Sequence, residues 1–181
     1  MPSRKDRVPV VFDTNVVVGY YLSRNPRSAR VQVFRLWRYE RKLQLIVSAD
    51  VVAEYAEVLA RVNAAEQRVK RFFEVLQQRQ TVTHVNLGAR HAISRDPDDD
   101  VLLATAAAGQ AHFLITNDHD LLDIPLAQKR RFRFEIVTPE RKHILDTIDF
   151  VGIMAALVIF QVSFIMKIFV LALRRRKNGN H

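Results

Sequence analysis

The stretch "DPDDDVLLATAAAGQAHFLITND" (Asp96–Asp118) decides the fold that we expect, because it joins a helix to a strand and carries acids at both ends. Pro97 suits the first turn of a helix, and Gly109 suits its C-terminal stop. The segment His112–Asp118 then predicts a buried strand that ends in polar residues. Like charges repel at the start of this helix, so its aspartates form either a solvated turn with a helix cap or part of a cation site.

A second strand with a similar ending lies near the N-terminus. "VPVVF" (Val8–Phe12) is a short apolar run rich in β-branched residues, and Asp13 to Asn15 follow it as a turn. "LQLIVS" (Leu43–Ser48) predicts another buried strand, and Ser48 or Asp50 is the expected N-cap of the helix after it. Two strands that lead into polar residues therefore lie on either side of the Leu43–Ser48 strand in the sequence.

The remaining predicted elements continue the alternation of helices and strands. In chain order they are a helix from Pro26 to about Leu43, a helix over roughly Ala65–Arg79, a short strand at Thr81–Val85, a strand at about Arg133–Val137 and a helix begun by Thr138. Such alternation favours an α/β domain with a parallel sheet.

Length and composition limit the classes of protein that fit. With 181 residues the chain is long enough for one domain with a sizeable core. It has no cysteine, which excludes disulfides and cysteine-ligated zinc or iron–sulfur sites. The net charge is +9, of which residues 150–181 contribute +5 and residues 1–149 only +4. The body of the chain is therefore mildly basic, which is compatible with a nucleic-acid substrate.

The C-terminal segment differs from the rest of the sequence. Residues 150–173 form an apolar run with a single charge, Lys167, and residues 174–181 form a basic tail. As a helix the run would be about 36 Å long, enough to cross a hydrocarbon core of about 30 Å. We expect a transmembrane or membrane-associated helix there, with a buried core or oligomerisation helix as the alternative. The domain that precedes this segment is then residues 1–149.

Acids stand where a parallel sheet would gather them. Asp13 and Asp118 directly follow predicted strands, and Glu54 lies in the first turns of the helix after Leu43–Ser48. Asp100 lies in the first turn of the helix that leads into the His112–Asp118 strand. Ligand sites form beyond the carboxyl ends of parallel strands. Carboxylates that meet there repel unless a divalent cation neutralises them, and Mg²⁺ or Mn²⁺ prefers such oxygen ligands.

Each acid also has a structural interpretation. Asp13 could make a turn with Asn15 or cap a helix, Glu54 alone would be a solvated helix residue, and Asp118 could be a turn acid. Asp96 precedes Pro97 and is a good N-cap. The ordered set of acids carries the functional hypothesis, because no single member does.

The ordered motifs resemble those of PIN-domain ribonucleases. The stretches are "VVFDTNVVVGYYL", "LIVSADVVAEYAEVL", "RDPDDDVLLATAAAGQAHFLITNDHDLL" and "FEIVTPERK", and the resemblance covers roughly Val8 to Ile148. It is closest to the group of toxin components of toxin–antitoxin pairs. The resemblance implies a three-layer α/β/α fold with a mostly parallel central sheet, and a Mg²⁺- or Mn²⁺-dependent endoribonuclease that cleaves single-stranded RNA. The apolar tail after Ile148 departs from the usual domain.

The resemblance also implies roles for particular residues. Asp13, Glu54, Asp100 and Asp118 match the catalytic, metal-ligating acids. The residues expected to support them are Asn15, Asp99, Thr116 and Asp120. Asn117-Asp118 stands in place of the glycine-aspartate pair common in this group. His119 lies between two of these acids, and we expect no catalytic role for it.

Partners and location follow from the same resemblance. We expect an RNA substrate, a cognate antitoxin and a homodimer, in a cytoplasmic domain held at the inner membrane by residues 150–173. The basic residues that could follow an RNA backbone are Arg24, Arg27, Arg30, Arg35, Arg38, Arg41 and the "KRRFR" run at Lys129–Arg133. Two alternatives remain: a catalytically inactive membrane-tethered module that binds RNA or protein, and a haloacid-dehalogenase-like phosphatase. The phosphatase would need a second aspartate where this chain has Asn15.

Overall fold

A parallel sheet of five strands forms the centre of the molecule in the computed structural model, which describes residues 7–87, 97–140 and 144. The strands are β1 (Val8–Phe12), β2 (Leu43–Ser48), β3 (Val82–Val85), β4 (Phe113–Ile115) and β5 (Glu135–Val137). Their order across the sheet is β3-β2-β1-β4-β5, and each neighbouring pair is parallel. The predicted mostly parallel α/β fold is therefore confirmed.

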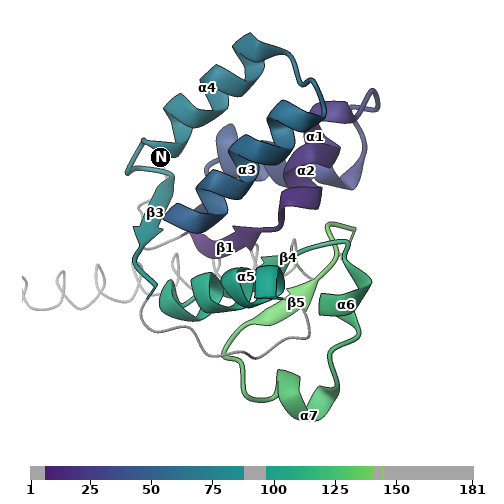
Figure 1. Ribbon diagram of the computed structural model, residues 1–181, viewed down its shortest axis with the longest axis vertical. Helices are drawn as coiled ribbons and strands as arrows, with labels where there is room; N and C mark the ends of the chain where they lie inside the picture. The colour runs from purple at the N-terminus through teal and green to yellow at the C-terminus, as the bar shows by residue number, and fades with distance from the viewer. Residues whose placement is uncertain (1–6, 88–96, 141–143, 145–181) are drawn as a thin grey trace, which may run out of the picture.

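Helices cover both faces of this sheet. They are α1 (Thr14–Leu22), α2 (Ala29–Arg38), α3 (Ala49–Arg61), α4 (Glu66–Leu76), α5 (Pro97–Ala108), α6 (His119–Leu122) and α7 (Leu126–Lys129). In Figure 1, α1 to α4 lie together on one side of the strands and α5 lies on the other side. This is the three-layer α/β/α arrangement that the sequence motifs predict.

The strand order reverses between β1 and β4. The chain leaves β1 towards β2 and β3, returns to β4 beside β1, and then continues outward to β5. The connection that leaves β1 runs to one side of the sheet order and the connection that leaves β4 runs to the other. A crevice forms between such connections, beyond the carboxyl ends of the two strands, and it is the usual ligand-binding position of these sheets. The segments that follow β1 and β4 contain Asp13 and Asp118.

The core is centred on aromatic rings between the sheet and the helices α1 to α4. The fully buried rings of Phe12, Phe34, Trp37 and Phe72 pack with centroid separations of 5.3–6.3 Å. These separations suit edge-to-face and offset aromatic pairs. Phe12 therefore fixes the end of β1, the strand that leads to Asp13, against the helical layer.

Three helices of the structure were not predicted from the sequence. The structure continues from Asp13 directly into α1, where a turn at Asp13 to Asn15 was predicted and a helix cap was the alternative, and it adds α6 and α7. Helix α1 was missed because "TNVVVGYYL" contains a β-branched run and is buried on more than one face, so it has no clear polar stripe. Helices α6 and α7 are single turns without room for a periodic pattern. Helix α2 is also shorter than the predicted Pro26–Leu43 segment.

Several expectations fall outside the described residues. These are the N-cap at Asp96, the helix begun by Thr138 beyond Glu140, the apolar run at residues 150–173 and the basic tail at 174–181. The division at residue 149 is likewise an expectation. Within residues 7–87, 97–140 and 144, no helix has the length and apolar character needed to cross a membrane.

Candidate active site

Asp13 occupies the junction between β1 and α1. Its backbone N–H donates to the carbonyl oxygen of Ile115 in β4 at 2.9 Å, so the backbone of Asp13 is fixed to the neighbouring strand. Its Oδ1 accepts a hydrogen bond from the N–H of Asn15 at 3.1 Å, which makes Asp13 the N-cap of α1. The residue is only 6% exposed. The capping role and the expected metal-ligand role thus concern one buried carboxylate.

Two side chains hold the second oxygen of this carboxylate. Asn15 Nδ2 donates to Asp13 Oδ2 at 2.6 Å, and the hydroxyl of Thr116 donates to the same oxygen. Asn15 Nδ2 also lies 3.2 Å from Thr116 Oγ1, and Asn15 Oδ1 accepts from the N–H of Asn117 at 3.1 Å. Asn15 therefore links the residues after β1 to those after β4. The structure brings Asn15 and Thr116 together beside Asp13, where the sequence motifs place them.

The environment raises the pKa of Asp13 from 3.8 to about 6. Burial is the largest cause, because it disfavours the charged form. Hydrogen bonds from Thr116 and Asn15 act in the opposite direction, and the negative charges of Glu54 and Asp118 raise the pKa further. The negative charges of two of the other three candidate acids, Glu54 and Asp118, therefore act on Asp13.

Glu54 reaches the site from α3. The hydroxyl of Ser48 accepts from the N–H of Val51 at 3.3 Å and caps this helix. Glu54 is half-buried, and the next residue, Tyr55, is completely buried. The Tyr55 hydroxyl donates to the carbonyl oxygen of Phe12, the residue before Asp13. Sequence reasoning missed this link, because a buried tyrosine on an apolar helix face gives no sign of what its hydroxyl contacts.

Asp100 lies in the first turns of α5 and is 8% exposed. Thr105, further along the same helix, places its hydroxyl 3.0 Å from Ser48 Oγ at the carboxyl end of β2. Five residues of helix span about 7.5 Å, so Asp100 lies beyond that point towards the same edge of the sheet. Asp99 also lies in α5, and its side chain is outside the described part of the structure.

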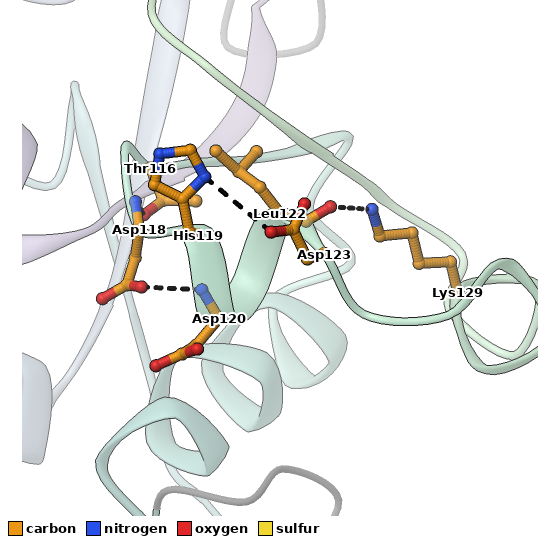
Figure 2. Close-up of polar contacts among 7 residues, drawn as sticks. All are labelled: Thr116, Asp118, His119, Asp120, Leu122, Asp123 and Lys129. Carbon is orange, nitrogen blue, oxygen red and sulfur yellow. Dashed lines mark hydrogen bonds and ion pairs between the residues drawn. The ribbon is translucent and has the colours of Figure 1, made fainter.

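Asp118 begins the short helix that follows β4. Its N–H donates to Thr116 Oγ1 at 2.8 Å, and its Oδ1 accepts from the N–H of Asp120 at 2.9 Å. Both acids are exposed. Figure 2 shows the His119 ring turned towards Asp123, 3.8 Å away, rather than towards the carboxylates of Asp118 and Asp120. That His119 has no catalytic role stays a prediction.

The donor set fits a hard divalent cation in its chemistry. Mg²⁺ takes oxygen ligands, is held by one or two carboxylates and keeps several waters. A buried carboxylate that feels two further negative charges is the environment that such a cation would stabilise. Within the described residues, however, no group of three or more histidine, cysteine, aspartate or glutamate side chains is placed to hold an ion. Asp13 is therefore the organised part of the site, and a ligand shell of four carboxylates stays a prediction.

Comparison with known proteins identifies the family. The sequence model described as "PIN domain" matches residues 9–120. A solved structure to which the chain is similar, VapBC2 from Rickettsia felis bound to a DNA fragment from their promoter, is 14% identical, with 72% of this chain and 98% of that chain covered and a TM-score of 0.49. No curated protein matches the sequence. Because the family model covers more than half of the sequence, from β1 through the turn after β4, the chain belongs to the PIN domain family, whose members are generally metal-dependent nucleases.

Proposed function

We propose that the chain is a Mg²⁺- or Mn²⁺-dependent endoribonuclease that cleaves single-stranded RNA. The observation that carries this proposal is the buried Asp13 carboxylate, held by Asn15 and Thr116 between β1 and β4 with the charges of Glu54 and Asp118 acting on it. Burying a carboxylate destabilises its charged form, so a folded protein retains one chiefly where a cation or a proton compensates. The chain belongs to the PIN domain family, whose members are generally metal-dependent nucleases, and this supports a cation as the compensating group.

In this proposal Asp13, Glu54, Asp100 and Asp118 hold the cation. A divalent cation at this position supplies Lewis-acid activation of a phosphodiester and of an attacking water. Asn15 and Thr116 orient the Asp13 carboxylate through their hydrogen bonds. The exposed Asp120 fixes the turn that carries Asp118 by donating its N–H to the Asp118 carboxylate, and Asp99 adjoins Asp100 in the sequence.

RNA is the proposed substrate, and exposed arginines provide the charge that its backbone requires. Arg24 and Arg27 lie in the exposed connection before α2, and Arg130, Arg131 and Arg133 are exposed around the end of α7. Arg35 is engaged with Glu40 at 3.2 Å, which makes it a weaker candidate. Cationic side chains that neutralise phosphates release counterions, so RNA affinity should fall as the salt concentration rises.

We further propose that the protein acts as the toxin of a toxin–antitoxin pair and forms a homodimer. This step rests on the combination of sequence motifs, which resembles that toxin group. A toxin of this kind would slow growth when expressed alone, and a small protein encoded beside it would relieve the effect. Light scattering of the purified protein tests the dimer, and co-purification with the neighbouring gene product tests the antitoxin.

Attachment to the inner membrane is proposed from the sequence of residues 150–173 alone. The proposal places residues 1–149 in the cytoplasm, where RNA substrates are. The positive-inside rule places the basic residues 174–177 on the cytoplasmic side as well, so a helix that enters and leaves the inner face satisfies both conditions. Carbonate extraction of membranes tests this attachment. The full chain should stay in the membrane fraction, and a chain truncated after Ile148 should be released. A full chain that remains soluble without detergent would contradict the attachment.

Cleavage of single-stranded RNA in the presence of Mg²⁺ or Mn²⁺ is the direct test of the enzymatic proposal. The matched variant is Asp13→Asn, which removes the charge and retains the shape. Activity that depends on the cation and disappears in the variant supports the nuclease. Equal cleavage by both proteins would contradict it, and RNA binding without cleavage would favour an inactive binding module. Turnover of a small phosphomonoester would favour the phosphatase, although Asn15 occupies the position of its second aspartate and donates its amide to Asp13.

A further inference from the structure

Tyr55 connects the helix that carries Glu54 to the strand that carries Asp13. Its hydroxyl donates to the carbonyl oxygen of Phe12 across a sequence separation of 43 residues, and the side chain is completely buried. The ring packs against Phe72 at a centroid separation of 5.8 Å, so the core fixes its position. The hydroxyl is therefore held in place independently of the carboxylates that lie beside it.

The position of Phe12 gives this hydrogen bond its importance. β1 pairs with β2 from Val8 opposite Leu43 to Val10 opposite Leu45, and Phe12 lies two residues further on. On the other side of β1, pairing with β4 continues to Phe12 opposite Ile115. The end of β1 is thus fixed to β4 by the strand ladder and to α3 by the Tyr55 hydroxyl. Asp13, the next residue, depends on both connections for its position.

Adjacent residues of a helix point about 100° apart, so Tyr55 can face the core while Glu54 stands at its margin. The exposure of the two residues agrees with this arrangement, because Tyr55 is fully buried and Glu54 is half-buried. A shift of α3 relative to β1 would therefore move Glu54 relative to Asp13. The hydrogen bond to Phe12 opposes that shift, because it joins the two residues that directly adjoin Glu54 and Asp13 in the sequence.

On this basis we propose that Tyr55 is a positioning residue, which sets the separation of the Glu54 and Asp13 carboxylates and so the affinity of the site for a divalent cation. The inference rests on the proposed metal-dependent function, and it adds a residue that touches neither cation nor substrate. Groups that orient metal ligands in this indirect way typically change metal affinity by about 10–100-fold when they are removed.

The variant that tests the inference is Tyr55→Phe, which removes only the hydroxyl. Tyr21→Phe is its matched control, because the Tyr21 hydroxyl also donates to a backbone carbonyl, that of Arg68, at 3.2 Å and away from the acids. Mn²⁺ binding to each full-length protein is measured by calorimetry without RNA, at a temperature below every thermal transition. RNA cleavage is measured in parallel as a function of Mn²⁺ concentration.

We expect Tyr55→Phe to weaken Mn²⁺ binding by about tenfold and to raise the Mn²⁺ concentration for half-maximal cleavage by a similar factor. Tyr21→Phe should leave both quantities unchanged. Equal Mn²⁺ affinity in Tyr55→Phe and the wild type would overturn the inference while leaving the nuclease proposal intact. If the wild type binds Mn²⁺ and cleaves no RNA, the nuclease proposal fails, and the Mn²⁺ affinities of the two variants still decide the role of Tyr55.

Discussion

The hydroxyl of Thr116 donates a hydrogen bond to the Asp13 carboxylate, although 103 residues separate them in the chain. The same hydroxyl oxygen accepts from the N–H of Asp118 at 2.8 Å. One buried threonine thus connects the acid after β1 to the acid after β4, at the point where the strand order reverses. The hydroxyl fixes two candidate ligands at once, so its removal should disturb both.

Replacing Thr116 by valine should weaken the site and destabilise the protein. The buried carboxylate would keep its hydrogen bonds from Asn15 and lose the one from Thr116, and the N–H of Asp118 would lose its acceptor. A hydrogen bond to a charged group is worth about 1.5–3 kcal/mol. The pKa of Asp13 should rise further, because the Thr116 hydrogen bond lowers it. Chemical denaturation and Mn²⁺ titration measure the two effects.

Thr81→Val is the matched control for that substitution. Thr81 is also buried, and its hydroxyl has no hydrogen-bond partner within the described part of the chain. The control should be neutral or slightly stabilising, because it removes a polar atom that burial leaves unpaired. Similar losses of stability in the two variants would contradict a specific role for the Thr116 hydroxyl.

Gly109→Ala should destabilise the packing of α5 on the sheet. A Cβ at this position would lie 2.3 Å from Ile46 Cγ2, so β2 or α5 would have to move. Overpacking of this kind typically costs about 1–3 kcal/mol. The double variant Gly109→Ala with Ile46→Ala should lose less free energy of unfolding than the two single variants added together. Additive losses would indicate that Ile46 does not cause the strain.

The strands β1 and β2 could be predicted to the residue because each is a short apolar run followed by a polar signal. "VPVVF" and "LQLIVS" coincide with Val8–Phe12 and Leu43–Ser48. The family assignment was also accessible, because the motifs that follow these strands keep a fixed order. The same motifs placed Asn15 and Thr116 near Asp13, and the structure does bring them together.

The contacts that cross between elements could not be predicted from the sequence. Nothing in "AEYAEVL" shows that the Tyr55 hydroxyl reaches Phe12, or that Thr105 reaches Ser48, because both contacts depend on how α3 and α5 pack on the sheet. Helix α1 was not predicted from the sequence for a related reason. Its valines are buried from several sides, so tertiary packing decides its conformation and local pattern does not.

Two neighbouring aspartates of α5 offer a matched pair for mutagenesis. Asp100→Asn should abolish metal-dependent cleavage, because Asp100 is buried near the edge of the sheet where the other acids lie. Asp98→Asn, two residues earlier, should matter little, because Asp98 is not among the acids that match the metal-ligating motif; the sequence suggested a solvated turn for Asp98, whereas the structure places it in α5. RNA cleavage and Mn²⁺ affinity measured for both variants give the comparison. Equal effects would mean that the charge of the helix start matters and that the position of the individual acid does not.

The raised pKa of Asp13 predicts how the stability of the metal-free protein depends on pH. The folded pKa is about 6 and the ordinary value is 3.8, so folding favours the protonated form. The stabilisation from this group is complete below about pH 4 and is lost as the pH rises through about 6. A shift of about two pKa units corresponds to about 3 kcal/mol. Asp13→Asn removes this titration, so its stability relative to the wild type should increase from pH 4.5 to pH 7.5.

Chemical denaturation in the presence of a chelator measures this difference, and subtracting the two proteins cancels the titration of the groups that do not interact with Asp13. Added Mn²⁺ supplies the complementary measurement, because a cation favours the charged carboxylate that burial disfavours. At pH 7.5 Mn²⁺ should therefore stabilise the wild type more than Asp13→Asn. This difference in stabilisation should be smaller at pH 5, where protons compete with Mn²⁺ for the Asp13 carboxylate. A stability difference that stays constant with pH, together with equal responses to Mn²⁺, would exclude Asp13 as the organised ligand of the site.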